Sequence, residues 1–324
     1  MKSISFFSLL SLLILLSCDS QKEEKILRLA HGLDTNHPVH QAMVHLGERL
    51  EETSEGKLKV IIYPSGQLGA ERECLELLQI GSLDVTKVSA AVLENFVPEY
   101  KVLSVPYIFR DKAHSHNVYD SEVGKRFLTK GENYRLRGLC FYDAGSRSFY
   151  TKDRPIITPS DLEGMKIRVQ KSNMAVAMVQ QLGGSPTPIS WGELYTALQQ
   201  GVVDGAENNL PSFHTSKHYE VCKFYSFDEH TAVPDVLLIG TVTWNRLNDQ
   251  ERKWLQEAAN ASAIYQREVW AQAEDEALRV IKEAGVAVNY PDKALFANKT
   301  RAFDELFEEG SEASQLMHAI KEIK

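Results

Sequence analysis

A unit of strand, helix, strand and helix occurs twice in this chain, and this repeat constrains the fold more than any other feature. The first copy spans about residues 26–89 and the second about residues 165–208. Their ends look alike, since residues 76–84 read ELLQIGSLD and residues 195–204 read YTALQQGVVD. Strands that alternate with helices of this length form parallel sheets covered by helices. The repeat predicts an α/β fold with two similar lobes; the alternative is one large sheet with a chance resemblance between two helices.

Local signals mark the elements of the second copy. Ser172 can cap the helix that follows the first strand, and Gly183-Gly184 can end it. Two prolines keep residues 185–189 extended, because proline and its preceding residue both disfavour a helix. Ser190 and Glu193 then form a capping box, which predicts the start of a second helix.

One long helix is expected over residues 248–285. Asn248 and Glu251 form a capping signal, and no proline or glycine interrupts the segment before Gly285. At a rise of ~1.5 Å per residue this helix is about 50 Å long, which is more than one small lobe needs. A coiled coil is the alternative, but the apolar stripe is rich in alanine and lacks a leucine heptad. The apolar stripe runs down one side of this helix at helical spacing: Trp254, Ala258, Ala261, Tyr265, Val269, Ala273, Ala277, Val280 and Ala284.

This helix is expected to lie across both lobes as a spine, with extended segments near Ala144 and Val233 crossing between the lobes as hinges. At 324 residues the chain exceeds what one hydrophobic core usually serves. The predicted division is residues 26–144 plus 234–273 for lobe I, and residues 145–233 plus 274–324 for lobe II.

Residues 1–17 have the pattern of an export signal. Lys2 precedes an apolar run that is too short to span a bilayer comfortably and that ends at Ser17-Cys18. The end of this run resembles a bacterial lipobox, which predicts cleavage before Cys18 and lipid attachment to it; the alternative is an ordinary signal peptide. The polar residues 18–25 then form a tether, and the expected location is periplasmic, with a lipid anchor in a membrane.

Composition excludes several other classes of protein. The net charge is −8, and the chain has no long run of lysine and arginine, which argues against a nucleic-acid partner. The remaining cysteines are widely spaced and odd in number, so we expect no disulfide framework and no zinc motif, but three buried thiols: Cys74, Cys140 and Cys222.

Catalytic and metal motifs are also missing from the sequence. It has no phosphate-binding glycine loop, no Gly-x-Ser-x-Gly elbow and no His-Glu-x-x-His motif, so we expect no enzyme and no cofactor. The spacings of the histidines fit no standard metal site, and surface histidines explain them better: His37, His40, His45, His114 and His116.

A series of motifs resembles one known family. In chain order these are HP at 37–38, YPSGQLG at 63–69, VPY at 105–107, GSR at 145–147, GMKIRV at 164–169, SPTP at 185–188, ELYTALQ at 193–199 and VDGAEN at 203–208. Together they resemble the substrate-binding proteins of tripartite ATP-independent periplasmic (TRAP) transporters, the DctP-like family. The resemblance implies two α/β lobes with a ligand cleft between them and a long helix bridging both. It also implies that the lobes close on an organic acid and present it to TRAP membrane permease subunits.

The resemblance implies a carboxylate clamp. An arginine at the position of Arg168 holds the ligand carboxylate, Asn208 supplies a side-chain amide, and Arg147 contacts the acid or another polar group. The chemistry agrees, because a planar guanidinium can donate two parallel hydrogen bonds to a carboxylate. Arg168 lies near the carboxyl end of a strand, where open sheets bind ligands. The alternative is a surface arginine at a strand edge.

Further residues follow from the same resemblance. Glu207 and His230 match a polar network that orients Arg168; the alternative is that they are buried groups of the core. The position of Ser89 carries a ligand-contacting acid in other members. The resemblance also implies that Glu71 and His31 reach ligand hydroxyls; the alternative for Glu71 is that it only favours a helix N-terminus. The residue type of Trp191 suits a platform for a sugar ring, and the alternative is that it packs in the core.

The ligand class is the last expectation. The run at residues 207–212, together with HYE at 218–220 and EH at 229–230, looks most like members that take hexuronates such as D-glucuronate or D-galacturonate. Alternatives are a binder of C4-dicarboxylates or other carboxylates, or a ligand-sensing module for a membrane receptor.

Overall fold

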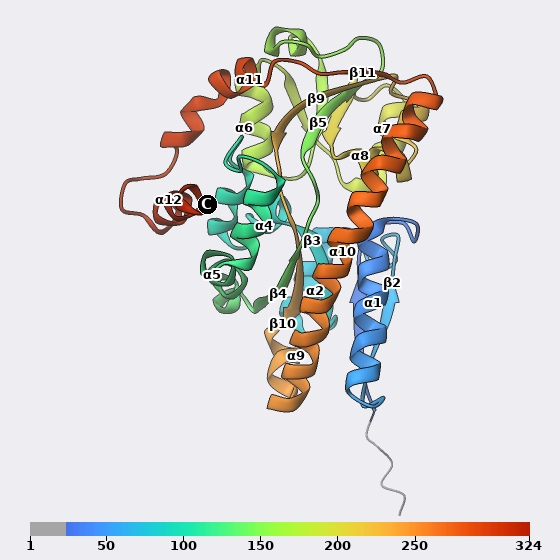
Figure 1. Cartoon of the computed structure of the whole chain (residues 1–324), viewed down its shortest axis with the longest axis vertical. Coiled ribbons are helices and arrows are strands. Elements are labelled where there is room, and N and C mark those ends of the chain that lie inside the picture. Colours follow the sequence, from blue (N-terminus) through green and yellow to red (C-terminus); the bar gives the residue numbers. More distant parts are fainter. Residues whose placement is uncertain (1–23) are drawn as a thin grey trace, which may run out of the picture.

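The computed structural model describes residues 24–324 and contains two mixed β-sheets surrounded by helices (Figure 1). The first sheet has the order β2-β1-β3-β10-β4 and consists of β1 (Lys25–Ala30), β2 (Leu58–Tyr63), β3 (Val85–Ser89), β4 (Leu136–Tyr142) and β10 (Asp235–Gly240). The second has the order β11-β9-β5-β8-β6-β7 and consists of β5 (Arg147–Thr151), β6 (Lys166–Val169), β7 (Ser185–Pro188), β8 (Gly205–Asn208), β9 (Phe224–Thr231) and β11 (Ala287–Asn289). We call the parts built on these sheets the first and second lobe, and the predicted two-lobed α/β fold is confirmed.

The internal repeat is visible in the topology of the sheets. In the first lobe β1 lies between β2 and β3 and is parallel to both; in the second lobe β6 lies between β7 and β8 and is parallel to both. An antiparallel strand follows in each sheet, β10 beside β3 and β5 beside β8. The two copies recognised in the sequence therefore form the same substructure.

The helices of the repeat are close to their predicted positions. They are α1 (Pro38–Thr53) and α2 (Glu71–Ile80) in the first lobe, and α6 (Asn173–Leu182), the short 3-10 helix η4 (Trp191–Glu193) and α7 (Leu194–Gln199) in the second. Ser172 caps α6, and Gly183 ends it with a left-handed φ of 102°. The proline-containing strand β7 occupies the edge of its sheet, where a missing amide hydrogen removes no internal pairing.

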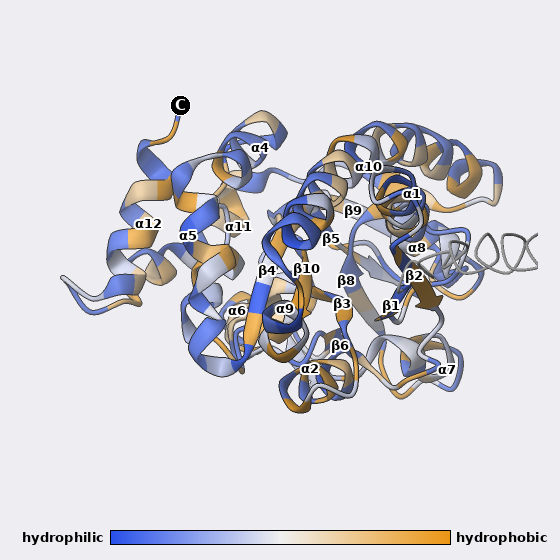
Figure 2. Cartoon of the chain, turned by 90° about the horizontal axis from the view of Figure 1, so that it is seen from below, coloured by the Kyte–Doolittle hydropathy of each residue, from blue (hydrophilic) through white to orange (hydrophobic). Residues whose placement is uncertain are grey.

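The remaining elements connect and cover the sheets. The α-helices are α3 (Ala90–Leu93), α4 (Lys112–Asp120), α5 (Glu122–Lys130), α8 (Leu210–Thr215), α9 (Thr241–Arg246), α10 (Asp249–Glu283), α11 (Lys293–Thr300) and α12 (Glu312–Glu322). The 3-10 helices are η1 (Pro98–Ser104), η2 (Glu132–Tyr134), η3 (Pro159–Leu162), η5 (His218–Glu220) and η6 (Arg301–Glu305). In Figure 2 hydrophobic residues are concentrated on the inner strands such as β3 and β10, and the surrounding helices carry hydrophilic residues outward.

The chain passes between the lobes at the two places that the sequence predicts. Residues 143–146 connect β4 of the first sheet to β5 of the second, and residues 232–234 connect β9 to β10. Ala144 and Val233 lie at these crossings, and both are buried. The movement of the lobes about these segments stays a prediction.

Helix α10 is the expected spine. It runs from Asp249 to Glu283 behind the Asn248–Glu251 capping box, and it lies beside α1 over much of its length (Figure 1). It also packs against β4 of the first lobe and α8 of the second. Leu255 and Trp270 join the first-lobe core, and Ile281 joins the second-lobe core, so one helix contacts both lobes.

The apolar stripe read from the sequence is not the most buried face of α10. Of that stripe only Ala258 and Ala277 are buried, and the buried face instead includes Leu255, Ala259, Ser262, Gln266, Trp270 and Ile281. The apolar pattern missed this face because two of its members are polar. The Ser262 hydroxyl pairs with that of Tyr142 at 2.9 Å, while Gln266 accepts from the amide of Asp143 at 2.8 Å and donates to its carbonyl at 2.7 Å. Buried polar groups with partners are as compatible with a core as apolar ones.

The C-terminal helix differs from the predicted division of the chain. Helix α11 packs against α6 and β9 of the second lobe, but α12 packs against η1 and α5, beside the first lobe. The carbonyl of Ile320 on α12 lies 3.0 Å from the Nε2 atom of His114 on α4. The placement of residues 274–324 in lobe II therefore does not describe α12, and the division as a whole stays a prediction.

Other expectations concern the cysteines and the N-terminal segment. Cys74, Cys140 and Cys222 are buried free thiols, as predicted. The export signal, Cys18 and most of the tether lie outside the described residues. Within residues 24–324 no helix is both long and apolar enough to cross a membrane.

We predict that Gln266→Ala lowers the free energy of unfolding by about 2–4 kcal/mol, because it leaves both backbone groups of Asp143 unpaired in a buried crossing. Urea denaturation followed by circular dichroism measures this change. Gln272→Ala on the exposed side of the same helix is the control and should change the stability by less than about 0.5 kcal/mol. Equal effects of the two substitutions would show that Gln266 does not hold the crossing.

Candidate functional site

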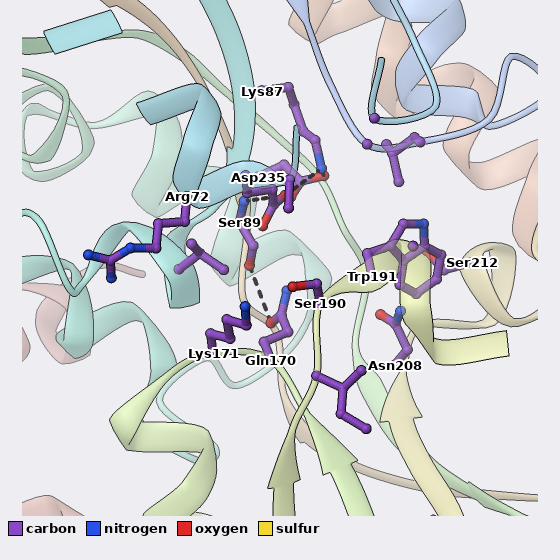
Figure 3. Close-up of a pocket in the computed structure, with 18 of the residues that line it drawn as sticks. Arg72, Lys87, Ser89, Gln170, Lys171, Ser190, Trp191, Asn208, Ser212 and Asp235 are labelled. Atoms are coloured by element: carbon purple, nitrogen blue, oxygen red, sulfur yellow. Dashed lines mark hydrogen bonds and ion pairs between the residues drawn. The ribbon is translucent and has the colours of Figure 1, made fainter. Parts of the chain in front are cut away.

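A cavity of about 470 Å³ lies between the two lobes. The carboxyl ends of the parallel strands β3, β6 and β8 open onto it, which is where open α/β sheets bind ligands. In Figure 3 Asn208, Trp191 and Ser212 lie across the open space from Lys87 and Ser89. Six of the seven predicted ligand-binding residues line the cavity: Glu71, Ser89, Arg147, Arg168, Trp191 and Asn208.

Arg168 is a buried cation that has no carboxylate partner among residues 24–324. It is 2% exposed, and its Nε donates to the Ile189 carbonyl at 2.9 Å. Within residues 24–324 its buried Nη1 has no hydrogen-bond partner, and no hydrogen bond is formed by Nη2. Burial lowers the pKa of Arg168 from its usual value, although an arginine stays protonated at physiological pH. A buried charge normally has a partner, so this guanidinium is suited to an anion in the cavity.

Arg147 lines the same cavity, but its donors are satisfied by the protein. Its Nη2 donates to Glu207 Oε1 and to the Glu207 carbonyl, both at 2.8 Å, and its Nε forms an ion pair with Glu207 Oε2. Nη1 donates to Asn208 Oδ1 at 2.7 Å. Burial alone would lower the pKa of Arg147, but the charge of Glu207 raises it above its usual value. The main role of Arg147 is therefore to stabilise the second lobe through Glu207 and Asn208.

A chain of charges continues behind Arg147, away from the cavity. His230 lies 3.4 Å from Glu207 Oε2 and 2.7 Å from Asp228 Oδ2, and all three residues are buried. Burial opposes each charge. The carboxylate of Asp228 nevertheless raises the pKa of His230 to about 9, and Arg147 with His230 lowers the pKa of Glu207 to about 2. The network therefore consists of two cations and two carboxylates at neutral pH.

This network corrects one expectation. Glu207 and His230 form a polar network as predicted, but they hold Arg147 and not Arg168. Successive residues of β8 point to opposite faces, so Glu207 lies behind the sheet while Asn208 lines the cavity.

The oxygen of the Asn208 side-chain amide has hydrogen-bond partners within the protein, while its nitrogen has none within residues 24–324. Its Oδ1 accepts from Arg147, from the Asn209 backbone at 2.9 Å and from the Asn209 side chain at 3.2 Å. These contacts leave the NH₂ group, which forms no hydrogen bond within the described part of the chain, as a donor beside Arg168. Together the two residues present donors for one carboxylate.

His31 does not line the cavity, contrary to expectation. It is buried behind the wall, with Nε2 3.0 Å from His40 Nδ1 and with Nδ1 accepting from the Leu33 amide at 3.1 Å. His37 lines the cavity instead and lies 3.1 Å from the Ser212 hydroxyl of the second lobe. Both ring nitrogens of His31 already have partners close by in the sequence, so neither is directed at a ligand in the cavity.

Trp191 and Ser89 are placed as expected. The indole packs against apolar residues of both lobes, and the Arg168 guanidinium carbon lies 6.0 Å from the ring centroid. Trp191 therefore packs against the cores and also lines the cavity, and its role as a platform for a sugar ring stays a prediction. The Ser89 hydroxyl lies 3.4 Å from Gln170 Oε1 across the cavity.

Sequence reasoning overlooked several polar residues of the cavity wall: His37, Lys87, Gln170, Lys171, Ser212 and Asp235. Lys87 could have been found, because it precedes Ser89 by two positions on one strand and so shares its face. Asp235 lies opposite Ser89 only because β10 pairs with β3, and a sequence pattern does not contain that pairing. Within residues 24–324 no group of three or more metal-ligating side chains gathers.

We predict effects of very different size on stability for the two arginines of the cavity. Arg147→Ala should lower the free energy of unfolding by about 3–5 kcal/mol, because it leaves the buried network of Glu207, Asp228 and His230 with two carboxylates and one cation. Arg168→Ala should change it by less than about 1 kcal/mol in the ligand-free protein, since it removes a charge that has no carboxylate partner. Urea denaturation without ligand tests both, and a similar loss in both variants would contradict this assignment.

The charge network also predicts a pH dependence. Because the pKa of His230 is raised from 6.5 to about 9, its contribution is complete below pH 6.5 and is lost as the pH rises towards 9. The pKa of Glu207 is lowered from 4.5 to about 2, so its contribution is complete above pH 4.5 and is lost towards pH 2. Between pH 6.5 and 9 the stability of wild type should therefore fall more steeply than that of His230→Gln. The exposed His318→Gln is the control, and parallel curves for wild type and His230→Gln would exclude the charged histidine.

Comparisons with known proteins agree with this geometry. The family model described as bacterial extracellular solute-binding protein, family 7 (DctP) matches residues 29–309. The uncharacterised protein YiiZ of Salmonella typhimurium is 39% identical over 275 residues, which is 84% of each chain.

Two crystal structures of TRAP periplasmic solute-binding proteins are also similar. One, from Bradyrhizobium sp. BTAi1 in complex with D-galacturonate, is 38% identical with a TM-score of 0.89, over 92% of this chain and 99% of its own. Another, from Anaerococcus prevotii with bound D-glucuronate, is 36% identical with a TM-score of 0.90, over 93% of this chain and 98% of its own. The sequence motifs, the two-lobed fold with its bridging helix and the family match agree, and the chain therefore belongs to the DctP family of bacterial extracellular solute-binding proteins.

Proposed function

We propose that this protein captures a hexuronate, such as D-glucuronate or D-galacturonate, and delivers it to TRAP membrane permease subunits. The single observation that carries the proposal is the buried guanidinium of Arg168, which faces the cavity without a carboxylate partner within residues 24–324. A bound carboxylate would accept from this guanidinium and from the Asn208 amide. Binding without chemical conversion is the role that fits, since the two groups hold an acid and the family is one of solute-binding proteins.

The charges of the wall favour a ligand with one carboxylate. The other buried cations that line the cavity are already paired, Arg147 with Glu207 and Lys87 with Glu71. Among the buried cations of residues 24–324 that line the cavity, the Arg168 guanidinium alone remains for an anion. The rest of the wall offers hydroxyl, amide and carboxylate groups, which suit ligand hydroxyls, and both similar crystal structures described above hold hexuronates.

Ligand capture by closure is supported by contacts across the cavity. The side-chain amide of Asn95 donates to the Lys171 carbonyl at 2.8 Å, and His37 pairs with Ser212 at 3.1 Å. Such contacts between the lobes form only when the lobes are close together. A ligand that binds Arg168 and the first lobe at once would shift the population towards this closed form, with residues 143–146 and 232–234 as hinges.

The proposed location is the periplasm, with the body held near a membrane by lipid on Cys18. The support is the Ser17-Cys18 sequence after an apolar run and the extracellular solute-binding family. Mass spectrometry of the exported protein checks the anchor, and an unmodified Cys18 would contradict it.

We predict that Arg168→Ala weakens hexuronate binding at least about 30-fold, because losing one partner of a buried charge pair costs about 2–5 kcal/mol. Arg168→Lys should bind with intermediate affinity, since it keeps the charge but loses the two parallel donors. Isothermal titration with D-galacturonate and D-glucuronate measures the affinities. Arg126→Ala, an exposed arginine of α5, is the control.

The same titration includes succinate as a C4-dicarboxylate. Binding of succinate but of neither uronate would contradict the ligand class, and wild-type affinity of Arg168→Ala would remove its central role. Protein that binds the uronate but docks on a membrane receptor instead of a permease would support the sensing alternative.

A further inference from the structure

The first-lobe wall of the cavity contains a buried lysine between two acids. Lys87 on β3 lies 3.2 Å from Glu71 Oε1 and 3.1 Å from Asp235 Oδ2. Glu71 opens α2 and Asp235 opens β10, so three elements bring these side chains together. We call Glu71, Lys87 and Asp235 the acidic triad; all three line the cavity, and Figure 3 shows Lys87 and Asp235 side by side.

The acidic triad is not neutral. One ammonium and two carboxylates give it a net charge of −1, and the side chains are only 4% (Lys87), 18% (Glu71) and 11% (Asp235) exposed. Burial opposes the charge on Lys87, but Asp235 and Glu71 raise its pKa above the usual value, so it stays an ammonium. The neighbouring His31 and His37 have lowered pKa values because of burial and of Lys87, and they add no positive charge.

Each acid of the acidic triad keeps one oxygen free. Glu71 uses Oε1 to accept from Lys87 and from the Ser89 amide at 3.1 Å, and Asp235 uses Oδ2 for Lys87. Within residues 24–324 no hydrogen bond reaches Glu71 Oε2 or Asp235 Oδ1. An ionised carboxylate only accepts, so these oxygens are suited to a ligand that donates, such as a hydroxyl group.

From this geometry we propose that the acidic triad is the specificity filter of the cavity: Glu71 and Asp235 accept from ligand hydroxyls, and their net negative charge rejects acids that carry a second carboxylate. The proposal rests on the proposed function, because it requires that Arg168 holds the carboxylate of the ligand. The cavity then has a positive side at Arg168 in the second lobe and a negative side at the acidic triad in the first lobe.

The two halves of the filter act on different ligands. A polyhydroxylated acid with one carboxylate places its hydroxyls against Glu71 and Asp235. A dicarboxylate of the same length places a second anion there, which cannot donate a hydrogen bond and is repelled in a partly buried site where charges are poorly screened. Lys87 is the positioning residue, because it holds both acids in place and compensates one of their two charges.

The test compares D-galacturonate with galactarate, which is the six-carbon acid with a carboxylate at both ends. Isothermal titration gives the ratio of the two dissociation constants for wild type, Asp235→Asn and Glu71→Gln. We expect wild type to prefer galacturonate and the ratio to fall at least about tenfold in each variant, since each removes one negative charge and keeps the size of the side chain. Because the same acids are compared in every variant, their difference in ring form cancels from the change in the ratio.

Glu73→Gln is the matched control, since it removes the charge of an exposed acid from the rim of the same cavity and should leave the ratio within about threefold of wild type. Circular dichroism verifies folding, and Glu71→Gln decides alone if Asp235→Asn does not fold. Uronate binding with an unchanged ratio in the folded variants overturns the filter but leaves the proposed function standing. A wild type that binds no uronate overturns both, and a ratio that falls equally in Glu73→Gln shows a general charge effect and overturns the filter.

Discussion

The site depends on the pairing of the Glu207 carboxylate with Arg147 and not with Arg168. Glu207 uses both of its oxygens and its backbone carbonyl on Arg147, and His230 lies against one of the same oxygens. Arg168, on the neighbouring strand β6, is left with one backbone acceptor. The second lobe thus contains a balanced ion network and, beside it, an unbalanced cation. This asymmetry makes the cavity a place for an anion, because a buried guanidinium gains most from a partner that the protein itself does not supply.

The frame that holds this site consists of two crossings and one helix. Both crossings contribute to the cavity wall, through Ala144 and Val233. Gln266 of α10 pairs with both backbone groups of Asp143, next to the first crossing. The spine therefore contacts the segment about which the lobes would move as well as the lobes themselves. A change in the angle between the lobes would have to be accommodated along α10 or at this pair of hydrogen bonds.

Local patterns predicted some features well and others poorly, for physical reasons. The strand–helix repeat and the bounds of α10 follow from periodicity, capping residues and glycine stops, which act within a few residues of each other. The buried face of α10 was not predictable in this way, because Ser262 and Gln266 are buried through partners that lie far away in the sequence. His31 illustrates the same limit at the site: its residue type is suited to ligand binding, but the fold places it behind the cavity wall.

The sequence by itself determined the α/β class, the repeat and the long helix, because these depend on local periodicity and capping residues. Its resemblance to a known family pointed to Arg168, Asn208 and Arg147, which line the cavity. Only the tertiary structure decided which arginine is satisfied and which is free, since that depends on the pairing of β5 with β8 and on the position of Glu207 behind the sheet. It also decided that Asp235 lies beside Lys87, because β10 returns from the second lobe to pair with β3. Charges far apart in the sequence, such as Lys87 and Asp235, become partners only when the chain has crossed between the lobes.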